Sequence, residues 1–214
     1  MSQAGQDLWV FGEAFNERHH GYFVDIGAHD GLYLSNTYIL ERRYNWNGIC
    51  VEANPETYAH LRQNRRTNCI NACLDSTERL VDFAKRGVMG GIVSPNTDNK
   101  ETAAHEIVQL KTQTLESLLQ TANAPHEIDY LSIDIEGAEE SVLGTFNFND
   151  YQFNCITIER PVEILRVRLK DNGYVLIKEI PNLDCFYVHE SFLHRYRVNL
   201  SRFYEKKFLM MRWR

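Results

Sequence analysis

The sequence predicts an α/β fold in which helices cover both faces of a mostly parallel sheet. Along most of the chain, short apolar runs alternate with segments of helical period. The runs are strongly apolar and crossover helices separate them, which is typical of a parallel sheet buried on both faces. A chain of 214 residues with 43% hydrophobic residues can fill one sizeable core. We therefore expect residues 1–214 to form a single domain.

The first half of the chain predicts the element order βαβαβ. Its expected elements are strand 22–26 (YFVDI), helix 35–44 (SNTYILERRY), strand 48–53 (GICVEA), helix 55–66 (PETYAHLRQNRR) and strand 68–74 (NCINACL). Pro55 supports the start of the second helix, because proline is favoured in the first helical turn. In sheets of this kind, ligands bind beyond the carboxyl ends of the strands.

The second half repeats this alternation. Its expected elements are helix 114–122 (TLESLLQTA), strand 128–135 (IDYLSIDI), helix 138–146 (AEESVLGTF), strand 153–159 (FNCITIE), helix 161–173 (PVEILRVRLKDNG), and two closing strands at 174–180 (YVLIKEI) and 184–190 (DCFYVHE). Residues 75–110 lie between the two halves and are irregular in pattern, with residues 85–101 (KRGVMGGIVSPNTDNKE) rich in Gly, Asn and Pro. We expect them to form a variable loop or a hairpin near the ligand-binding edge.

The composition argues against some classes of partner. A formal net charge of -6 and a pI near 5.8 disfavour general nucleic-acid binding. No apolar run approaches the roughly 18 residues of a membrane span, so we expect no transmembrane segment. The start of the chain lacks the features of a signal peptide, which predicts a cytoplasmic protein. The five cysteines lack paired metal-ligand spacing and are expected to be reduced core thiols.

The two ends of the chain carry expectations of their own. Residues 1–20 are expected to form an N-terminal helical cover, and residues 190–214 a basic C-terminal tail. Residues 194–214 contain seven Lys or Arg and one Glu, a composition suited to weak contact with an anionic membrane surface. The interpretation that we prefer is a helix packed on the body, or on a second subunit of a homodimer, through Phe203, Phe208, Leu209 and Trp213.

The turn DIGAHDG, which follows the first expected strand, indicates a class of ligand. Gly27 and Gly31 permit a tight turn and close backbone approach. The dinucleotide fingerprint G-x-G-x-x-G requires a glycine where His29 stands, and the third glycine is also missing, so a pyrophosphate site is disfavoured. The pattern of Asp25 and the two glycines suits a ligand with an amino-acid end, because acidic and carbonyl groups bind an ammonium and helix-end N–H groups bind a carboxylate. S-adenosylmethionine (SAM) is such a ligand.

The ends of the next two expected strands agree with this interpretation. Glu52 ends the second strand about 20 residues beyond the glycine turn, where a carboxylate accepts hydrogen bonds from ribose hydroxyls. Residues 71–73 end the third strand and are expected to border the adenine. The alternative is that the glycines only turn the chain and that Glu52 is a solvated strand end.

Five stretches of this sequence resemble the FkbM family of SAM-dependent methyltransferases. They are SQAGQD, FVDIGAHDGLYLSNTYILE, GICVEANP, NACL and IDYLSIDIEGAEESVL, which together span most of residues 2–159. The resemblance implies the class I methyltransferase (Rossmann-like) fold, a three-layer α/β/α sandwich with a mostly parallel seven-stranded sheet and an antiparallel closing strand. It also implies methyl transfer to a hydroxyl oxygen, on a sugar of a surface glycan or glycoconjugate or on a secondary metabolite.

The resemblance and the motifs together define an expected SAM site. Its residues are Gln6, Asp25, Gly27, Ala28, Asp30, Gly31, Ser35, Asn36, Thr37, Glu52, Ala53, Asn71, Ala72, Cys73 and Asp134. Gln3, Gln6 and Asp7 match the opening segment of the family, which is expected to cover the cofactor. The chain departs from the family at Arg160, where many relatives are expected to carry a histidine, and over residues 85–110. Both departures concern the acceptor site.

Acidic residues at the ends of two later strands are the candidates for catalysis. Asp134, Glu136 and Glu159 are expected to converge, because neighbouring parallel strands lie about 4.8 Å apart. One of them could act as a general base with a raised pKa. Alternatively, the three could bind a Mg²⁺ ion that activates the acceptor hydroxyl. The spacing of Asp129 and Asp134 resembles that of metal-dependent catechol-type O-methyltransferases.

Other interpretations of these residues stay open. Asp134 and Glu136 could cap the following helix, and we assign Glu139 and Glu140 to its first turn, where acids are favoured. His189 is a further candidate base, expected to reach the site from a late strand. The function itself has two alternatives of other classes, a Rossmann-type NAD oxidoreductase and a non-catalytic SAM-binding module.

Overall fold

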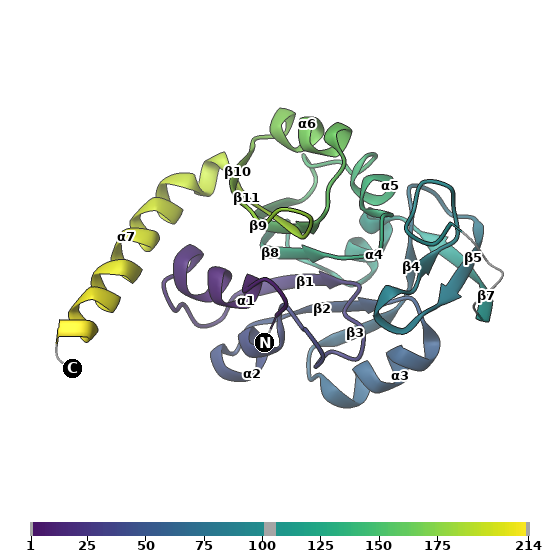
Figure 1. The fold of residues 1–214 in the computed structure, drawn as a ribbon, viewed down its shortest axis with the longest axis horizontal. Helices are drawn as coiled ribbons and strands as arrows, with labels where there is room; N and C mark the ends of the chain where they lie inside the picture. Colours follow the sequence, from purple (N-terminus) through teal and green to yellow (C-terminus); the bar gives the residue numbers. More distant parts are fainter. Residues whose placement is uncertain (1, 101–105, 213–214) are drawn as a thin grey trace.

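The computed structural model describes residues 2–100 and 106–212, with side chains up to residue 208. A seven-stranded sheet, in the order β10-β11-β9-β8-β1-β2-β3, forms its centre (Figure 1). The strands are β1 (Tyr22–Ile26), β2 (Asn47–Glu52), β3 (Asn68–Asn71), β8 (Glu127–Ile133), β9 (Gln152–Glu159), β10 (Tyr174–Glu179) and β11 (Asp184–His189). Six strands of this sheet run in one direction, and β11 runs opposite to them. The predicted mostly parallel sheet with an antiparallel closing strand is confirmed.

Helices cover both faces of this sheet. They are α1 (Gln6–Leu8), the π-helix η1 (Trp9–Ala14), α2 (Tyr38–Tyr44), α3 (Pro55–Asn64), α4 (Leu115–Thr121), α5 (Glu139–Leu143), α6 (Glu163–Asp171) and α7 (Glu190–Arg212). On one face, Leu40 and Leu61 of α2 and α3 pack with Phe23 of β1. On the other face, Leu118 of α4 and Leu165 of α6 belong to a second buried cluster. The predicted three layers are therefore present.

A second, smaller sheet follows β3. It has the order β4-β7-β5-β6 and consists of β4 (Cys73–Leu74), β5 (Leu80–Lys85), β6 (Gly91–Ile92) and β7 (Glu106–Gln113). The single strand expected at 68–74 is wrong, because the chain leaves the central sheet at Ala72 and pairs next with β7. Of the two structures expected for 75–110, the irregular loop is wrong and the hairpin is closer, since β5 and β7 pair antiparallel.

The helix expected from residue 35 begins at Tyr38 instead. Ser35 and Thr37 use their side chains in the preceding turn, where the Ser35 hydroxyl accepts from the backbone N–H groups of Thr37 and Tyr38. Thr37 donates its own hydroxyl to Asp25 at 2.5 Å. Side chains that bond locally in this way favour turns over helix interiors.

The two ends of the described chain pack on each other. Asn199 of α7 donates to the carbonyl of Ala14 at 2.7 Å, and the Phe203 ring fills the space beside Gly12. α7 passes along the side of the molecule away from the second sheet (Figure 1). This contact supports the packed interpretation of the tail as far as Phe203, whereas Trp213 and the side chain of Leu209 lie outside the described residues. No helix in the described part of the chain has both the length and the apolar composition to cross a membrane.

Candidate active site

Two adjoining cavities lie at the carboxyl ends of β1, β2, β8 and β9. The first, here the apolar cavity, is lined by Ile26, Gly27, His29, Val51, Glu52, Ala53, Ala72, Cys73, Leu74, Phe83, Gly87, Val88, Gly90, Gly91, Ile92, Asp134, Ile135 and Ala138. The second, here the polar cavity, has a volume of about 350 Å³ and is lined by Gln3, Gln6, Asp25, Gly27, Ala28, His29, Tyr33, Leu34, Ser35, Asn36, Val88, Met89, Asp134, Glu136, Glu159, Arg160 and Asn182. Gly27 and Asp134 line both, so the cavities meet where β1 and β8 end.

The glycine turn is shaped by close contacts within the protein. Gly27 has φ +83°, and a Cβ atom there would lie 1.9 Å from the Asp134 carbonyl oxygen. Gly31 has φ +77°, and a Cβ atom there would lie 2.6 Å from Cγ of Arg65. Gly27 lines both cavities, but Gly31 lines neither. The structure therefore gives Gly31 a packing role, in which it makes room for Arg65, and its contact with the cofactor stays a prediction.

A buried ion pair between Arg65 and Glu41 packs against this turn. Arg65 donates from Nε to Glu41 Oε2 at 2.6 Å and from Nη2 to the Thr37 hydroxyl at 3.0 Å. The Thr37 hydroxyl in turn donates to Asp25, whose pKa is raised by burial and lowered in part by the charge of Arg65. Asp25 lines the polar cavity, whereas Thr37 does not. Sequence reasoning missed Arg65, because no local pattern distinguishes it from the other cations after α3.

Glu52, the residue expected to contact the ribose, ends β2 and lines the apolar cavity. Its Oε1 accepts from the Asn54 backbone N–H at 2.8 Å, and its Oε2 accepts from the His29 backbone N–H at 3.0 Å. Burial raises the pKa of the Glu52 carboxyl to about 6 despite these hydrogen bonds. A carboxylate has about four acceptor positions, so two remain for a ligand. The alternative of a solvated strand end is wrong, because Glu52 is only 9% exposed.

Two of the three residues expected at the end of β3 line the apolar cavity. Ala72 and Cys73 line the apolar cavity, as does Ala53 after β2. Asn71 does not, because its side chain donates to the carbonyl oxygens of Glu52 and Ala53 at 2.8 and 3.0 Å. Phe83 and Ile92 of the second sheet complete the cavity wall. These two residues were not expected, although the alternation around Phe83 was visible in the sequence.

The remaining expected SAM residues divide into two groups. Ala28, Ser35 and Asn36 line the polar cavity, and Oδ1 of Asn36 is buried without a hydrogen-bond partner among the described residues. Gln6 also lines this cavity, and its amide donates to Asp184 at 2.8 Å, which ties the opening segment to β11. Asp30 lines neither cavity. Its carboxylate instead accepts the backbone N–H groups of residues 32 and 33, so its expected contact with the cofactor stays a prediction.

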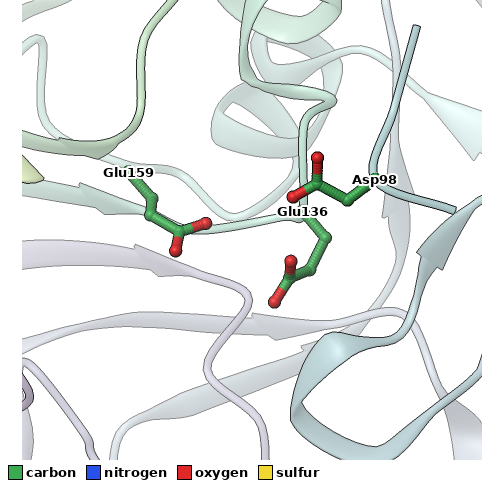
Figure 2. A group of neighbouring side chains, drawn as sticks. All are labelled: Asp98, Glu136 and Glu159. Carbon is green, nitrogen blue, oxygen red and sulfur yellow. The ribbon is translucent and has the colours of Figure 1, made fainter. Parts of the chain in front are cut away.

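Two of the three acidic residues expected to converge at the strand ends, Glu136 and Glu159, meet at Arg160. Figure 2 shows Glu136 and Glu159 pointing into the same space as Asp98, a residue of the second sheet's connecting loop that sequence reasoning missed. Nη2 of Arg160 contacts Asp98 at 2.5 Å, Glu159 at 2.7 Å and Glu136 at 3.4 Å. Burial and the nearby Glu159 raise the pKa of Glu136 to about 7. Arg160 therefore neutralises only part of the charge of this cluster.

A metal site of the expected composition does not form. Among the described residues, two acidic trios have ligand atoms within 4.8 Å of one another, and they are Asp98 with Glu136 and Glu159, and Asp134 with Glu139 and Glu159. The expected trio of Asp134, Glu136 and Glu159 is not one of them. In the first trio, the guanidinium of Arg160 already contacts each carboxylate. In the second, Glu139 accepts the Ile135 backbone N–H at 2.8 Å, as expected for an acid at a helix start.

His189 lies at the opposite end of the strands from the two cavities, too far away to act on a ligand bound there. It ends β11, the antiparallel strand, and it pairs with Tyr174 at the beginning of β10. The opposite end of β11, at Asp184, pairs with Glu159. Nδ1 of His189 bonds to the Ser191 hydroxyl at 2.8 Å, and the ring lines neither cavity. The expectation that His189 is a catalytic base is wrong, because an antiparallel strand places its carboxyl end away from those of its neighbours.

Comparison with known families decides the membership of this chain. Residues 25–176, more than half of its length, match the model of the methyltransferase FkbM domain. The chain belongs to the FkbM methyltransferase family. This confirms the resemblance, and with it a SAM-dependent methyltransferase in place of the oxidoreductase alternative. No curated protein matches the chain in sequence.

Several solved structures are similar to this FkbM methyltransferase domain. The FkbM methyltransferase of Methylobacillus flagellatus KT has 13% identity and a TM-score of 0.50, over 79% of this chain and 44% of that chain. TrmK of M. capricolum, solved with S-adenosyl-homocysteine (SAH), has 14% identity and a TM-score of 0.44, over 81% and 63%. A TehB-like methyltransferase of Corynebacterium glutamicum has 9% identity and a TM-score of 0.47, over 88% and 89%. The chain thus spans less than two thirds of the length of the first two.

Unusual backbone conformations gather at the polar cavity of this FkbM domain. Ten described non-glycine residues have a positive φ, and half of them line this one cavity: His29, Leu34, Glu136, Arg160 and Asn182. Each costs of order 1 kcal/mol or more and persists only where the surrounding structure holds it. Strain concentrated in this way is typical of functional sites.

Proposed function

We propose that this domain transfers the methyl group of SAM to a hydroxyl oxygen of its acceptor, and that the acceptor is a sugar of a surface glycan or glycoconjugate. One observation carries the proposal. The polar cavity joins the Gly27 turn, expected to hold the cofactor, to the acidic cluster around Glu136. With SAM bound at that turn, an electrophilic methyl group and a carboxylate able to take a proton would share one cavity.

The residues that line the two cavities have the chemical character that the parts of SAM require. Ala53, Cys73, Phe83 and Ile92 give the apolar walls that an adenine ring needs. Glu52 retains free acceptor positions for the ribose hydroxyls. Asn36 offers its unpartnered Oδ1 to the ammonium of the methionine end. When bound, SAM supplies a methyl group on a sulfonium, which is already a good electrophile.

The protein then has to make the acceptor oxygen nucleophilic and align it. A hydroxyl is a poor nucleophile while it holds its proton, and a base with a pKa near the working pH removes that proton efficiently. Glu136, with its pKa raised to about 7, fits this role. Arg160 holds Glu136 and Glu159 in place through its contacts at 3.4 and 2.7 Å. Burial, together with Glu159, also raises the pKa of Asp134, so this carboxyl favours its neutral, hydrogen-bond-donating form.

The experiment separates cofactor binding from proton removal. SAH should bind at micromolar affinity or better in a calorimetric titration, and NAD should not bind. Methyl transfer from labelled SAM to a panel of glycosides should fall about 100-fold or more in Glu136→Gln, with SAH affinity unchanged. Glu140→Gln is the matched control, since Glu140 is an exposed acid nearby. An equal loss in both variants would remove Glu136 as the base.

Metal activation is the other use of the same acids. We propose that Glu136 acts as a general base and that these acids do not bind Mg²⁺. The reason is that the Arg160 guanidinium already brings a positive charge to Asp98, Glu136 and Glu159. Methyl transfer should therefore persist in EDTA. Activity lost in EDTA and restored by Mg²⁺ would instead assign the acids to a metal.

A further inference from the structure

Four exposed apolar residues surround the polar cavity. Tyr33 and Leu34 belong to the turn after Gly31, and Val88 and Met89 belong to the 3-10 helix η2 (Gly87–Met89) that follows β5. Each is between 39% and 59% exposed. Single exposed apolar residues are common, but a group of them beside a polar cavity is typical of a binding site. We call Tyr33, Leu34, Val88 and Met89 the apolar lip.

Leu34 is held in an unfavourable conformation in this lip. Its φ is +52°, in the left-handed region that bulky residues avoid. Its side chain is 39% exposed and therefore recovers little of this cost by burial. A residue that is both strained and exposed contributes little to the stability of the free protein. The position therefore points to a use in binding.

The interior of the polar cavity has the opposite character. Asp134, Glu136 and Glu159 line it, with Arg160 as their cationic neighbour. Carboxylates accept hydrogen bonds from hydroxyl groups and repel anions. The volume of about 350 Å³ must also hold the methionine end of SAM. An acceptor larger than the space left beside the cofactor would extend past the apolar lip.

We propose that the acceptor is amphipathic, with an uncharged hydroxyl-bearing part inside the polar cavity and an apolar part lying on the apolar lip. The inference rests on the proposed methyl transfer and deepens it by naming the substrate class. It also makes Leu34 and Met89 determinants of specificity. A small amphipathic molecule fits better than a protein surface, because the lip residues line the cavity itself and continue its wall outward.

The experiment compares three probes on the full chain saturated with SAH. They are octyl β-glucoside below its micelle concentration, methyl β-glucoside and octyl β-glucuronide, each titrated by calorimetry. Octyl β-glucoside should bind at least about tenfold more tightly than methyl β-glucoside, because its chain covers the lip. Octyl β-glucuronide should bind at least about tenfold more weakly than octyl β-glucoside, because its carboxylate meets the acidic cluster.

A paired variant tests the lip directly. Leu34→Asn with Met89→Gln should abolish the preference for the octyl chain, measured on the variant saturated with SAH. Asparagine tolerates the left-handed conformation, so the turn is retained. The matched control is Ile164→Gln, which removes a 68% exposed apolar residue of α6 that lines neither cavity. It should keep the preference.

Three outcomes would overturn the inference. They are octyl and methyl glucosides binding equally, an octyl preference that survives in the paired variant, and a paired variant that changes the oligomeric state in sedimentation, which would make the lip a self-association surface. A wild-type chain that fails to bind SAH would instead overturn the proposed function. The two failures are therefore distinguishable.

Discussion

The two halves of the site place their cations differently. On the proposed cofactor side, under the turn after β1, the buried Arg65 pairs directly with Glu41, and its charge offsets part of the effect of burial, which raises the pKa of Asp25. On the proposed acceptor side, beyond β8 and β9, Arg160 contacts three carboxylates, and the pKa of Glu136 is raised to about 7. The first half thus has a buried cation paired with one acid, whereas in the second half a more exposed cation is shared among three acids.

This difference indicates how each half works. The buried ion pair of Arg65 and Glu41 fixes the backbone of the turn after β1, as a preformed cofactor site requires. An excess of carboxylates raises their pKa values toward neutrality, as proton removal at neutral pH requires. We therefore expect substitutions on the cofactor side to affect folding and affinity, and those on the acceptor side to affect pH dependence.

The largest effect is expected from Arg65→Met. The change leaves Glu41 buried without its cation, which should lower the free energy of unfolding by about 3–5 kcal/mol in urea denaturation. Arg166→Met is the control, because it removes a more exposed ion pair with Glu179 and should cost about 1 kcal/mol or less. Similar losses in the two variants would contradict the expectation that the buried pair stabilises the protein more than the exposed pair does.

A smaller loss is expected from Gly27→Ala. The new Cβ atom would lie 1.9 Å from the Asp134 carbonyl oxygen, at a φ of +83°, so the backbone must shift. We expect a loss of about 2–4 kcal/mol in the same measurement. Gly87→Ala is the control, because its φ is +61° but no atom lies within 4 Å of the new Cβ. If the two variants lose the same stability, the close approach of β8 to the turn has no energetic role.

Glu52→Ala should weaken SAH binding without unfolding the protein. We expect about a tenfold rise in Kd, or 1.4 kcal/mol, measured by calorimetry. Glu56→Ala, in the exposed first turn of α3, should bind SAH as the wild type does. Burial raises the pKa of Glu52 to about 6. The SAH affinity of the wild type should therefore also fall below pH 6, as the Glu52 carboxylate becomes protonated and loses its capacity to accept hydrogen bonds from the ribose. Unchanged affinity in Glu52→Ala would remove the proposed ribose contact.

The smallest effect is the pH dependence of stability on the acceptor side. The pKa of Glu136 is raised from 4.5 to about 7 in the folded protein, so the folded state binds more protons than the unfolded state between these values. The contribution of Glu136 to the free energy of unfolding should therefore rise as pH falls from 8 to 6. We expect a rise of about 1 kcal/mol, or about 2 °C in Tm. Glu136→Gln should flatten this rise in a thermal melt, and Glu140→Gln should not. Identical pH profiles for all three proteins would contradict the charge excess.

Sequence reasoning worked best where structure is local. The strands around 22–26 and 153–159, the start of α3 at Pro55 and the place of Glu52 all follow from apolar period and strand-end position. It failed where a residue's partner lies far along the chain. Asp98 contacts Arg160 across 62 residues, and His189 ends a strand whose direction the local pattern does not encode.

The sequence by itself determined the layered α/β fold, the family and the carboxylate at the end of β2, because periodicity and short motifs are properties of neighbouring residues. Only the tertiary structure decided that Gly31 serves Arg65, that the second sheet supplies Phe83 and Ile92, and that Arg160 gathers the acids of the acceptor side. These features depend on strand order and direction. Both are fixed by packing between distant segments, so no local pattern can reveal them.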